Sequence, residues 1–178
     1  MILGKRPPRR LVYVQISAER ILLKRVATGD TLDDIPQVAM DLRSGPVAYG
    51  RAAGEAAEWR ADLQLVNGFS HPRCVLGDMP IAAMTLRWFI DRLVNPRGRL
   101  RLRKFKPYLV LHPVGVRDLS GLEAWGLQRV AQMAGAARVR VWLGEEPPYE
   151  SLIGGLPTGG AWLALPPTRR RLLRRGDG

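Results

Sequence analysis

The chain has 178 residues, of which 46% are hydrophobic, so it can bury one sizeable core and is not wholly disordered. No apolar run reaches the ~20 residues of a membrane-spanning helix, and no apolar stretch of a secretory signal follows the charged N-terminus. The single cysteine, Cys74, excludes an intramolecular disulfide framework and fits a reducing compartment, so we expect a cytoplasmic protein.

The net charge of +12 is unevenly distributed along the chain. Residues 1–10, 95–106 and 168–178 together carry +14, so the rest of the chain is close to neutral, at −2. Such basic segments attract nucleic acid, an anionic membrane surface or an acidic protein, or they are simply solvated. The residues that we expect to contact an anionic partner are Arg97, Arg99, Arg101, Arg103, Lys104, Lys106, Arg169, Arg170 and Arg171.

The N-terminal part of the chain is predicted to be mostly β-structure. Two runs rich in β-branched residues, 11–16 and 21–26, are separated by a short turn, which predicts a β-hairpin. The other elements expected before residue 60 are a turn at 27–34, a third strand at 35–40, a short strand at 47–50 and a helix at 51–59.

A long amphipathic helix is predicted over 79–94. Asp78 is its expected N-cap, and Pro80 in the first turn is compatible with a helix start. Apolar residues recur at spacings of three and four, which is typical of a helix that packs on a core.

The clearest unit follows, because a strand, a helix and a strand succeed one another within ~35 residues. The strands are expected at 107–112 and 138–143, and the helix between them at Asp118 or Ser120 up to Gly135. A short helix at 147–153 and a last strand at 161–165 complete the pattern. These elements predict an α/β domain whose mixed sheet carries helices on its faces.

Five short blocks occur in a recognisable order. They are 35–40 (IPQVAM), 47–50 (VAYG), 75–79 (VLGDM), 112–115 (HPVG) and 134–157, which contains AGA, GEEP and LP. The set resembles the MreB family of bacterial actin-like, rod shape-determining proteins. This resemblance implies the N-terminal half of the actin-like ATPase fold, with a ribonuclease H-like core, over residues 11–165 as a single domain. Basic tails are then expected at 1–10 and 166–178, and a basic ribbon at 95–106.

The resemblance also implies where ATP and Mg²⁺ would bind, between this lobe and a second lobe that we expect the chain to lack. The first phosphate loop of the family corresponds to 15–20 (QISAER), where Gln15 replaces an aspartate and Glu19 adds a negative charge. The positions that would contact the nucleotide are Ser17, Ala18, Gly159 and Gly160.

The second phosphate loop of the family corresponds to 162–169. Ala164 stands where the family has an aspartate, and Pro166 and Pro167 lack the N–H groups that a phosphate cradle needs. Glu146 matches the family residue that positions the attacking water, although a Glu-Glu-Pro sequence is also a common helix start. A general base without metal ligands and phosphate donors lacks the electrostatic stabilisation that phosphoryl transfer requires. We therefore expect no ATPase activity and no cofactor, with ATP and Mg²⁺ as the cofactors if any are bound.

Metal and thiol chemistry have little support in the sequence. His71 and Cys74 are three residues apart and His112 is distant, which is too few ligands for a zinc site. No ordered Cys–His pair is evident either, so Cys74 is expected to be a small buried residue.

The resemblance favours a cytoskeletal or scaffold protein of cell-shape determination. Its expected partners are a full-length MreB-like protein or a second copy of itself, together with an anionic membrane surface. Two alternatives stay open: a basic module that binds nucleic acid, and an ATP-binding lobe that a partner chain completes.

Overall fold

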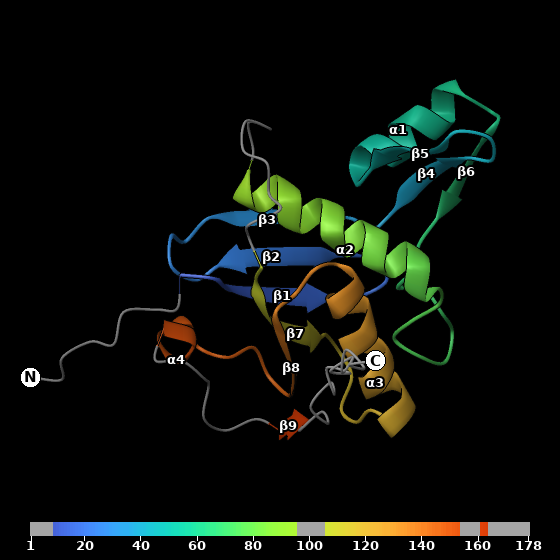
Figure 1. Ribbon diagram of the computed structural model, residues 1–178. Helices are drawn as coiled ribbons and strands as arrows, with labels where there is room; N and C mark the ends of the chain where they lie inside the picture. Colours follow the sequence, from blue (N-terminus) through green and yellow to red (C-terminus); the bar gives the residue numbers. More distant parts are fainter. Residues whose placement is uncertain (1–8, 96–105, 154–160, 164–178) are drawn as a thin grey trace, which may run out of the picture.

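The computed structural model describes residues 9–95, 106–153 and 161–163 and shows two β-sheets of different size (Figure 1). Within these residues, the larger sheet has six strands in the order β3-β2-β1-β7-β8-β9. Strands β1, β7 and β8 are parallel, whereas β2, β3 and β9 pair antiparallel with their neighbours, so the sheet is mixed. The strands are β1 (Leu11–Ile16), β2 (Ile21–Arg25), β3 (Thr31–Asp34), β7 (Tyr108–Pro113), β8 (Arg138–Leu143) and β9 (Ala161–Leu163).

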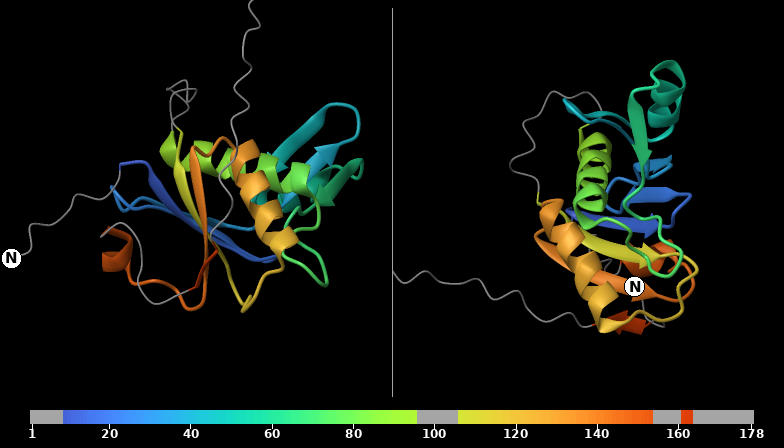
Figure 2. Two further views of the ribbon diagram at one scale, coloured as in Figure 1. Left: turned by 60° about the horizontal axis from the view of Figure 1, so that its bottom comes forward. Right: turned by 90° about the vertical axis from the view of Figure 1, so that its right-hand side faces the viewer.

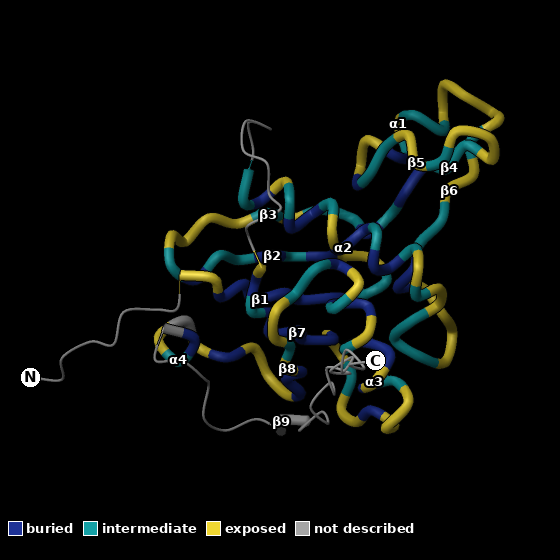
Figure 3. The backbone as a smooth tube through the Cα atoms, in the orientation of Figure 1, coloured by how far each residue is buried: buried dark blue, intermediate teal, exposed yellow. Residues whose placement is uncertain are grey.

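Helices α2 (Met79–Val94) and α3 (Gly121–Met133) lie together on one face of the large sheet (Figure 2). Every second residue of β1 belongs to the main core, together with apolar residues of both helices. The whole of β1 is buried (Figure 3). The largest core side chain from α2 is Phe89, which is fully buried.

Both helices begin at the residues that the sequence indicates. The Asp78 side chain accepts the N–H of Ile81 at 2.8 Å. Ser120 caps α3 through a capping box, in which its hydroxyl accepts the N–H of Glu123 and the Glu123 carboxylate accepts the N–H of Ser120. Gly135 follows α3 at a φ of 95°, the left-handed conformation that ends helices.

The opposite face of the large sheet carries a smaller apolar cluster. Its members come from β1, β7, β8 and α4 (Tyr149–Ile153) and include Val26, which directly follows β2; Leu152 is the contribution of α4. Tyr13 and Trp142 are the largest buried side chains of this cluster. The same face bears the buried polar residues described below.

A second unit protrudes from the large sheet (Figure 1). It consists of the antiparallel strands β4 (Val38–Asp41), β5 (Gly45–Tyr49) and β6 (Leu63–Val66), in the order β5-β4-β6, and of helix α1 (Arg51–Trp59). The ring of Tyr49 stacks on Trp88 of α2 with 4.9 Å between centroids. This contact joins the small unit to the main core.

The carboxylate of Asp34 forms a second connection between the two units. Its Oδ1 accepts the N–H groups of Ile35 at 2.8 Å and of Arg51 at 2.9 Å, so it caps α1 in place of Gly50, which has no side chain. A Cβ atom at Gly50 would lie 2.4 Å from Asp34 Oδ2, and the φ of Gly50 is 70°. The close approach therefore requires glycine here.

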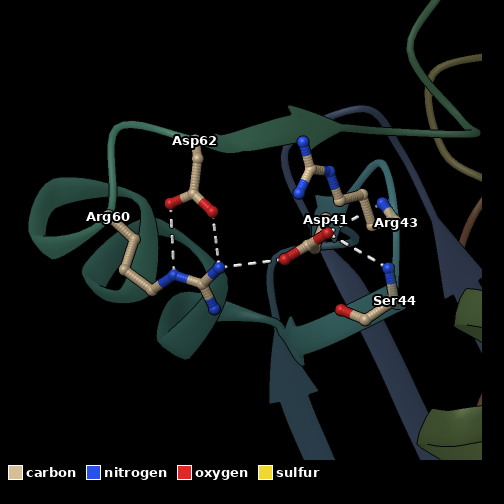
Figure 4. A network of polar contacts seen from close by, with 5 residues as sticks. All are labelled: Asp41, Arg43, Ser44, Arg60 and Asp62. Carbon is tan, nitrogen blue, oxygen red and sulfur yellow. Dashed lines mark hydrogen bonds and ion pairs between the residues drawn. The ribbon is translucent and has the colours of Figure 1, made fainter.

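An ion network closes the far end of the small unit (Figure 4). Arg60 pairs with Asp41 at 2.9 Å and with Asp62 at 2.5 Å. The N–H groups of Arg43 and Ser44 also donate to Asp41, and these bonds lower the pKa of Asp41 to about 2.

Most predicted elements are confirmed; some have the predicted boundaries and the others differ by at most three residues at an end. The exception is the turn expected at 27–34, because Thr31–Asp34 forms the edge strand β3. Strand β6 has no counterpart among the predicted elements. The last two residues of the strand expected at 161–165 lie outside the described residues.

Candidate functional site

The β1–β2 turn, residues 17–20, is closed by its own hydrogen bonds. The Ser17 hydroxyl accepts the N–H of Glu19 at 3.2 Å and of Arg20 at 3.0 Å, and the N–H of Ser17 donates to the Arg20 carbonyl at 2.9 Å. Three of the four N–H groups of the turn thus have partners within the turn itself. Asn67 holds the turn from outside by donating to the Ala18 carbonyl at 2.7 Å.

Charged side chains surround this turn. The guanidinium of Arg20 binds the Asp33 carboxylate through two bonds of 2.9 and 2.7 Å, and this hydrogen bonding lowers the pKa of Asp33. Glu146 is exposed in the segment after β8, and its charge acts on Arg20 and on His112. The structure therefore brings Glu146 to the same end of the sheet as the β1–β2 turn.

Buried hydrogen bonds near the turn connect side chains of β1 and β7 to the backbone just after β8. The Tyr13 hydroxyl lies 2.5 Å from His112 Nδ1, and Gln15 Nε2 donates to the same hydroxyl at 3.3 Å. His112 Nε2 lies 2.9 Å from the carbonyl of Gly144. Burial raises the pKa of Tyr13 and lowers the pKa of His112.

A pocket of about 500 Å³ opens beside the turn, at the carboxyl ends of β1 and β7. The turn residues Ser17 and Glu19 line it, together with the 69–75 segment, residues 114–118 and Glu123. Three acids, Glu19, Asp118 and Glu123, line it against one arginine, Arg73.

Cys74 and His71 lie in the wall of this pocket, and their arrangement corrects one expectation. Cys74 Sγ is 3.0 Å from His71 Nδ1, so an ordered Cys–His pair does exist, and Cys74 is only half-buried. The same sulfur donates to the Leu76 carbonyl at 3.0 Å, and the N–H of Arg73 donates to His71 Nδ1. Two acceptors, His71 Nδ1 and the Leu76 carbonyl, therefore face the single thiol hydrogen of Cys74.

Many of the predicted site residues lie outside the described residues. Among the basic residues expected to contact an anionic partner, Lys106 is described, and it is exposed. Within the described ranges, no group of three or more potential ligands lies close enough to hold a metal ion. The site residues outside these ranges are Gly159, Gly160, Arg97, Arg99, Arg101, Arg103, Lys104, Arg169, Arg170 and Arg171.

No helix in the part of the chain that the structure describes is both long and apolar enough to cross a bilayer. No family model matches the chain, and no curated protein matches it.

Among solved structures, MreB5 of Spiroplasma citri bound to ADP is similar, with a TM-score of 0.57 and 19% sequence identity. The match covers 74% of this chain and 37% of that chain. MreB5 of the same organism bound to AMPPNP has the same TM-score and identity, over 76% of this chain and 39% of that chain. The chain thus spans less than two fifths of the length of these proteins, and at this identity the likeness shows the fold alone. The fold is a mixed α/β lobe of the actin-like type.

Proposed function

We propose that this chain is an MreB-like cytoskeletal or scaffold protein of the cytoplasm that takes part in cell-shape determination. It acts by association with an actin-like filament protein and does not turn over ATP by itself. The observation that carries this proposal is the closed β1–β2 turn, in which Ser17 occupies the N–H groups of Glu19 and Arg20.

A phosphate cradle needs free N–H groups that point at the ligand. In this turn three N–H groups are already bonded within the turn, so a phosphate would first have to displace those bonds. The Arg20 guanidinium is also neutralised by Asp33, and Glu19 adds a negative charge. These features oppose binding of a triphosphate, and Gln15 in place of the family's aspartate removes a group that would manage Mg²⁺.

Association with a filament protein does not require ATP turnover by this chain, and two features favour it. The fold is similar to that of part of MreB5, and a net charge of +12 would attract acidic surfaces of a filament or of a membrane. Long-range attraction of this kind weakens as salt is added.

The test is co-sedimentation of the purified chain with a full-length MreB protein, at low and high salt. We expect the chain to pellet with the filaments at low salt and to be released at high salt. An unrelated basic protein of similar size serves as the control for charge alone. If the chain stays in the supernatant at low salt, association with such filaments is wrong.

Calorimetry with ATP and Mg²⁺ tests the second part of the proposal separately. We expect no heat of binding from the chain alone, whereas a full-length MreB protein provides the positive control. Binding by the chain alone would contradict the closed-turn reasoning. Binding only when a partner chain is added would favour an ATP-binding lobe that the partner completes.

Nucleic-acid binding is the second candidate, and the net charge of +12 favours it. It predicts a DNA affinity that falls steeply with salt. Absence of a shift with generic DNA at low salt would exclude it.

A further inference from the structure

Three polar side chains are buried together at the carboxyl ends of β1 and β7. Tyr13, Gln15 and His112 have exposed fractions of 1%, 6% and 4%. Strands β1 and β7 lie side by side (Figure 1). They pair in parallel with Gln15 opposite His112, so the sheet register itself brings these groups together. Buried polar groups at this depth almost always have a hydrogen-bond partner.

The hydrogen-bond partners fix the protonation of His112 at neutral pH. The carbonyl of Gly144 can only accept, so His112 Nε2 carries the proton and donates to it. In a neutral imidazole Nδ1 then accepts, and the Tyr13 hydroxyl donates to it. Gln15 Nε2 donates to the oxygen of Tyr13, which completes a chain of bonds that all run in one direction.

Protonation of His112 is incompatible with this direction. Nδ1 becomes a donor, so the Tyr13 oxygen has to accept from it and the phenolic hydrogen has to find another acceptor. The amide of Gln15 can provide this acceptor. Its nitrogen contacts the Tyr13 hydroxyl in the structure, and rotation of the amide by 180° would put its oxygen in the same place. The bond from Nε2 to Gly144 remains in both states.

We propose that His112, Tyr13 and Gln15 form a pH-dependent switch, in which protonation of His112 reverses the two bonds to Tyr13 and turns the Gln15 amide over. The Gln15 amide that turns over lies near the end of β1, two residues before Ser17 and the closed turn. The end of the Gln15 amide that faces away from Tyr13 is an acceptor in the neutral state and a donor in the acid state.

The surrounding charges bear on the pH at which the switch acts. Burial disfavours the imidazolium, and the carboxylate of Glu146 opposes this effect in part. The charged or titratable groups on the described elements that share the His112 face of the sheet, or follow β8 beside it, are Tyr13 on β1, Lys24 opposite Tyr13 on β2, Tyr108 on β7, Arg138 and Arg140 on β8, Glu145 and Glu146 after β8, and Glu150 on α4.

The tautomer provides the first test. The chain has two histidines, so long-range ¹H–¹⁵N correlation spectra of the ¹⁵N-labelled full chain contain two imidazole patterns, and the His71→Gln variant assigns them. We expect His112 to be the Nε2–H tautomer at pH 7.5 and to titrate below its ordinary pKa. The Nδ1–H tautomer, or titration at or above the ordinary value, would overturn the proposal.

Two substitutions of Gln15 then test the reversal itself, with opposite expected signs. Gln15→Met keeps the length of the side chain but offers no oxygen to the phenol, so the pKa of His112 is expected to fall further. Gln15→Glu offers only acceptors and a negative charge, so the pKa of His112 is expected to rise. Circular dichroism checks that both variants fold, and if Gln15→Met does not, the sign in Gln15→Glu decides. An unchanged pKa of His112 in a folded variant refutes a role for the Gln15 amide.

Discussion

The backbone around Gly68 passes so close to the start of α2 that even a methyl group does not fit. A Cβ atom at this position would lie 2.2 Å from the nitrogen of Ala82, 2.6 Å from its Cα and 2.7 Å from the carbonyl oxygen of Asp78. The carbonyl of Gly68 in turn accepts the N–H groups of Gly77 and Asp78, which closes the 67–78 loop. All three close neighbours are backbone atoms and none can rotate away.

The variant Gly68→Ala therefore forces a displacement of the loop from α2 by about 1.2 Å, the gap between 2.2 Å and the 3.4 Å of an ordinary contact. Overpacking of this kind costs about 3 kcal/mol when the neighbours cannot adjust. For a chain of 178 residues this predicts a melting temperature lower by about 6–12 °C.

A second glycine provides the matched control. Gly54 lies inside α1, and no atom lies within 4 Å of the place that a Cβ atom would take, so Gly54→Ala is expected to stabilise its helix by about 0.5–1 kcal/mol. Thermal unfolding followed by circular dichroism compares the two variants with the unaltered chain. If Gly68→Ala melts at the temperature of the unaltered chain, the loop and α2 can separate without cost and the reasoning is refuted.

Two further predictions concern a helix cap and an ion network. Ser120→Ala removes the cap of α3 and is expected to lower the free energy of unfolding by about 1 kcal/mol, whereas Ser120→Asp retains most of it; equal melting temperatures for the two variants would contradict this. Asp41→Asn is expected to destabilise the protein at neutral pH, because the pKa of Asp41 is lower in the folded state than in the unfolded state. The stabilising contribution of the Asp41 carboxylate is complete above about pH 4 and is lost as the pH falls towards 2, so melting curves of the two proteins should converge over that range. A gap that stays constant from pH 5 to pH 2 would show that the carboxylate has no such role.

The elements that the sequence predicts correctly are those with strong local signals. Asp78 and Ser120 are side chains that cap helices by themselves, and Gly135 takes a backbone conformation that other residues avoid. The β1–β2 hairpin likewise has two apolar runs joined by a turn of four residues. Each of these features acts within a few residues, so a single sequence is enough to find it.

The elements that escaped prediction depend on distant partners. Thr31–Asp34 has one apolar residue, and it is a strand because β2 pairs with it at the edge of the sheet. Strand β6 is only four residues long and is held by β4, more than twenty residues earlier in the chain. Propensity carries little information in such short segments, since pairing decides their structure.

The candidate site shows the same limit. The sequence identifies Gln15 as a departure from the family pattern, but not its bond to Tyr13 or the contact between Tyr13 and His112, which are 99 residues apart. The register of β1 against β7 creates that contact. The Cys74–His71 pair is close in sequence, yet its geometry depends on how the 67–78 loop closes.

The attachments of the small unit have a consequence for how the protein can move. One carboxylate, Asp34, holds the start of α1, and one pair of stacked rings, Tyr49 and Trp88, fixes β5 against α2. These contacts lie at separate points, so a tilt that lifts the small unit from either point would have to break a contact. The two sheets are therefore expected to be coupled in their thermal motion, and loss of either the Asp34 carboxylate or the Tyr49 ring should loosen the small unit.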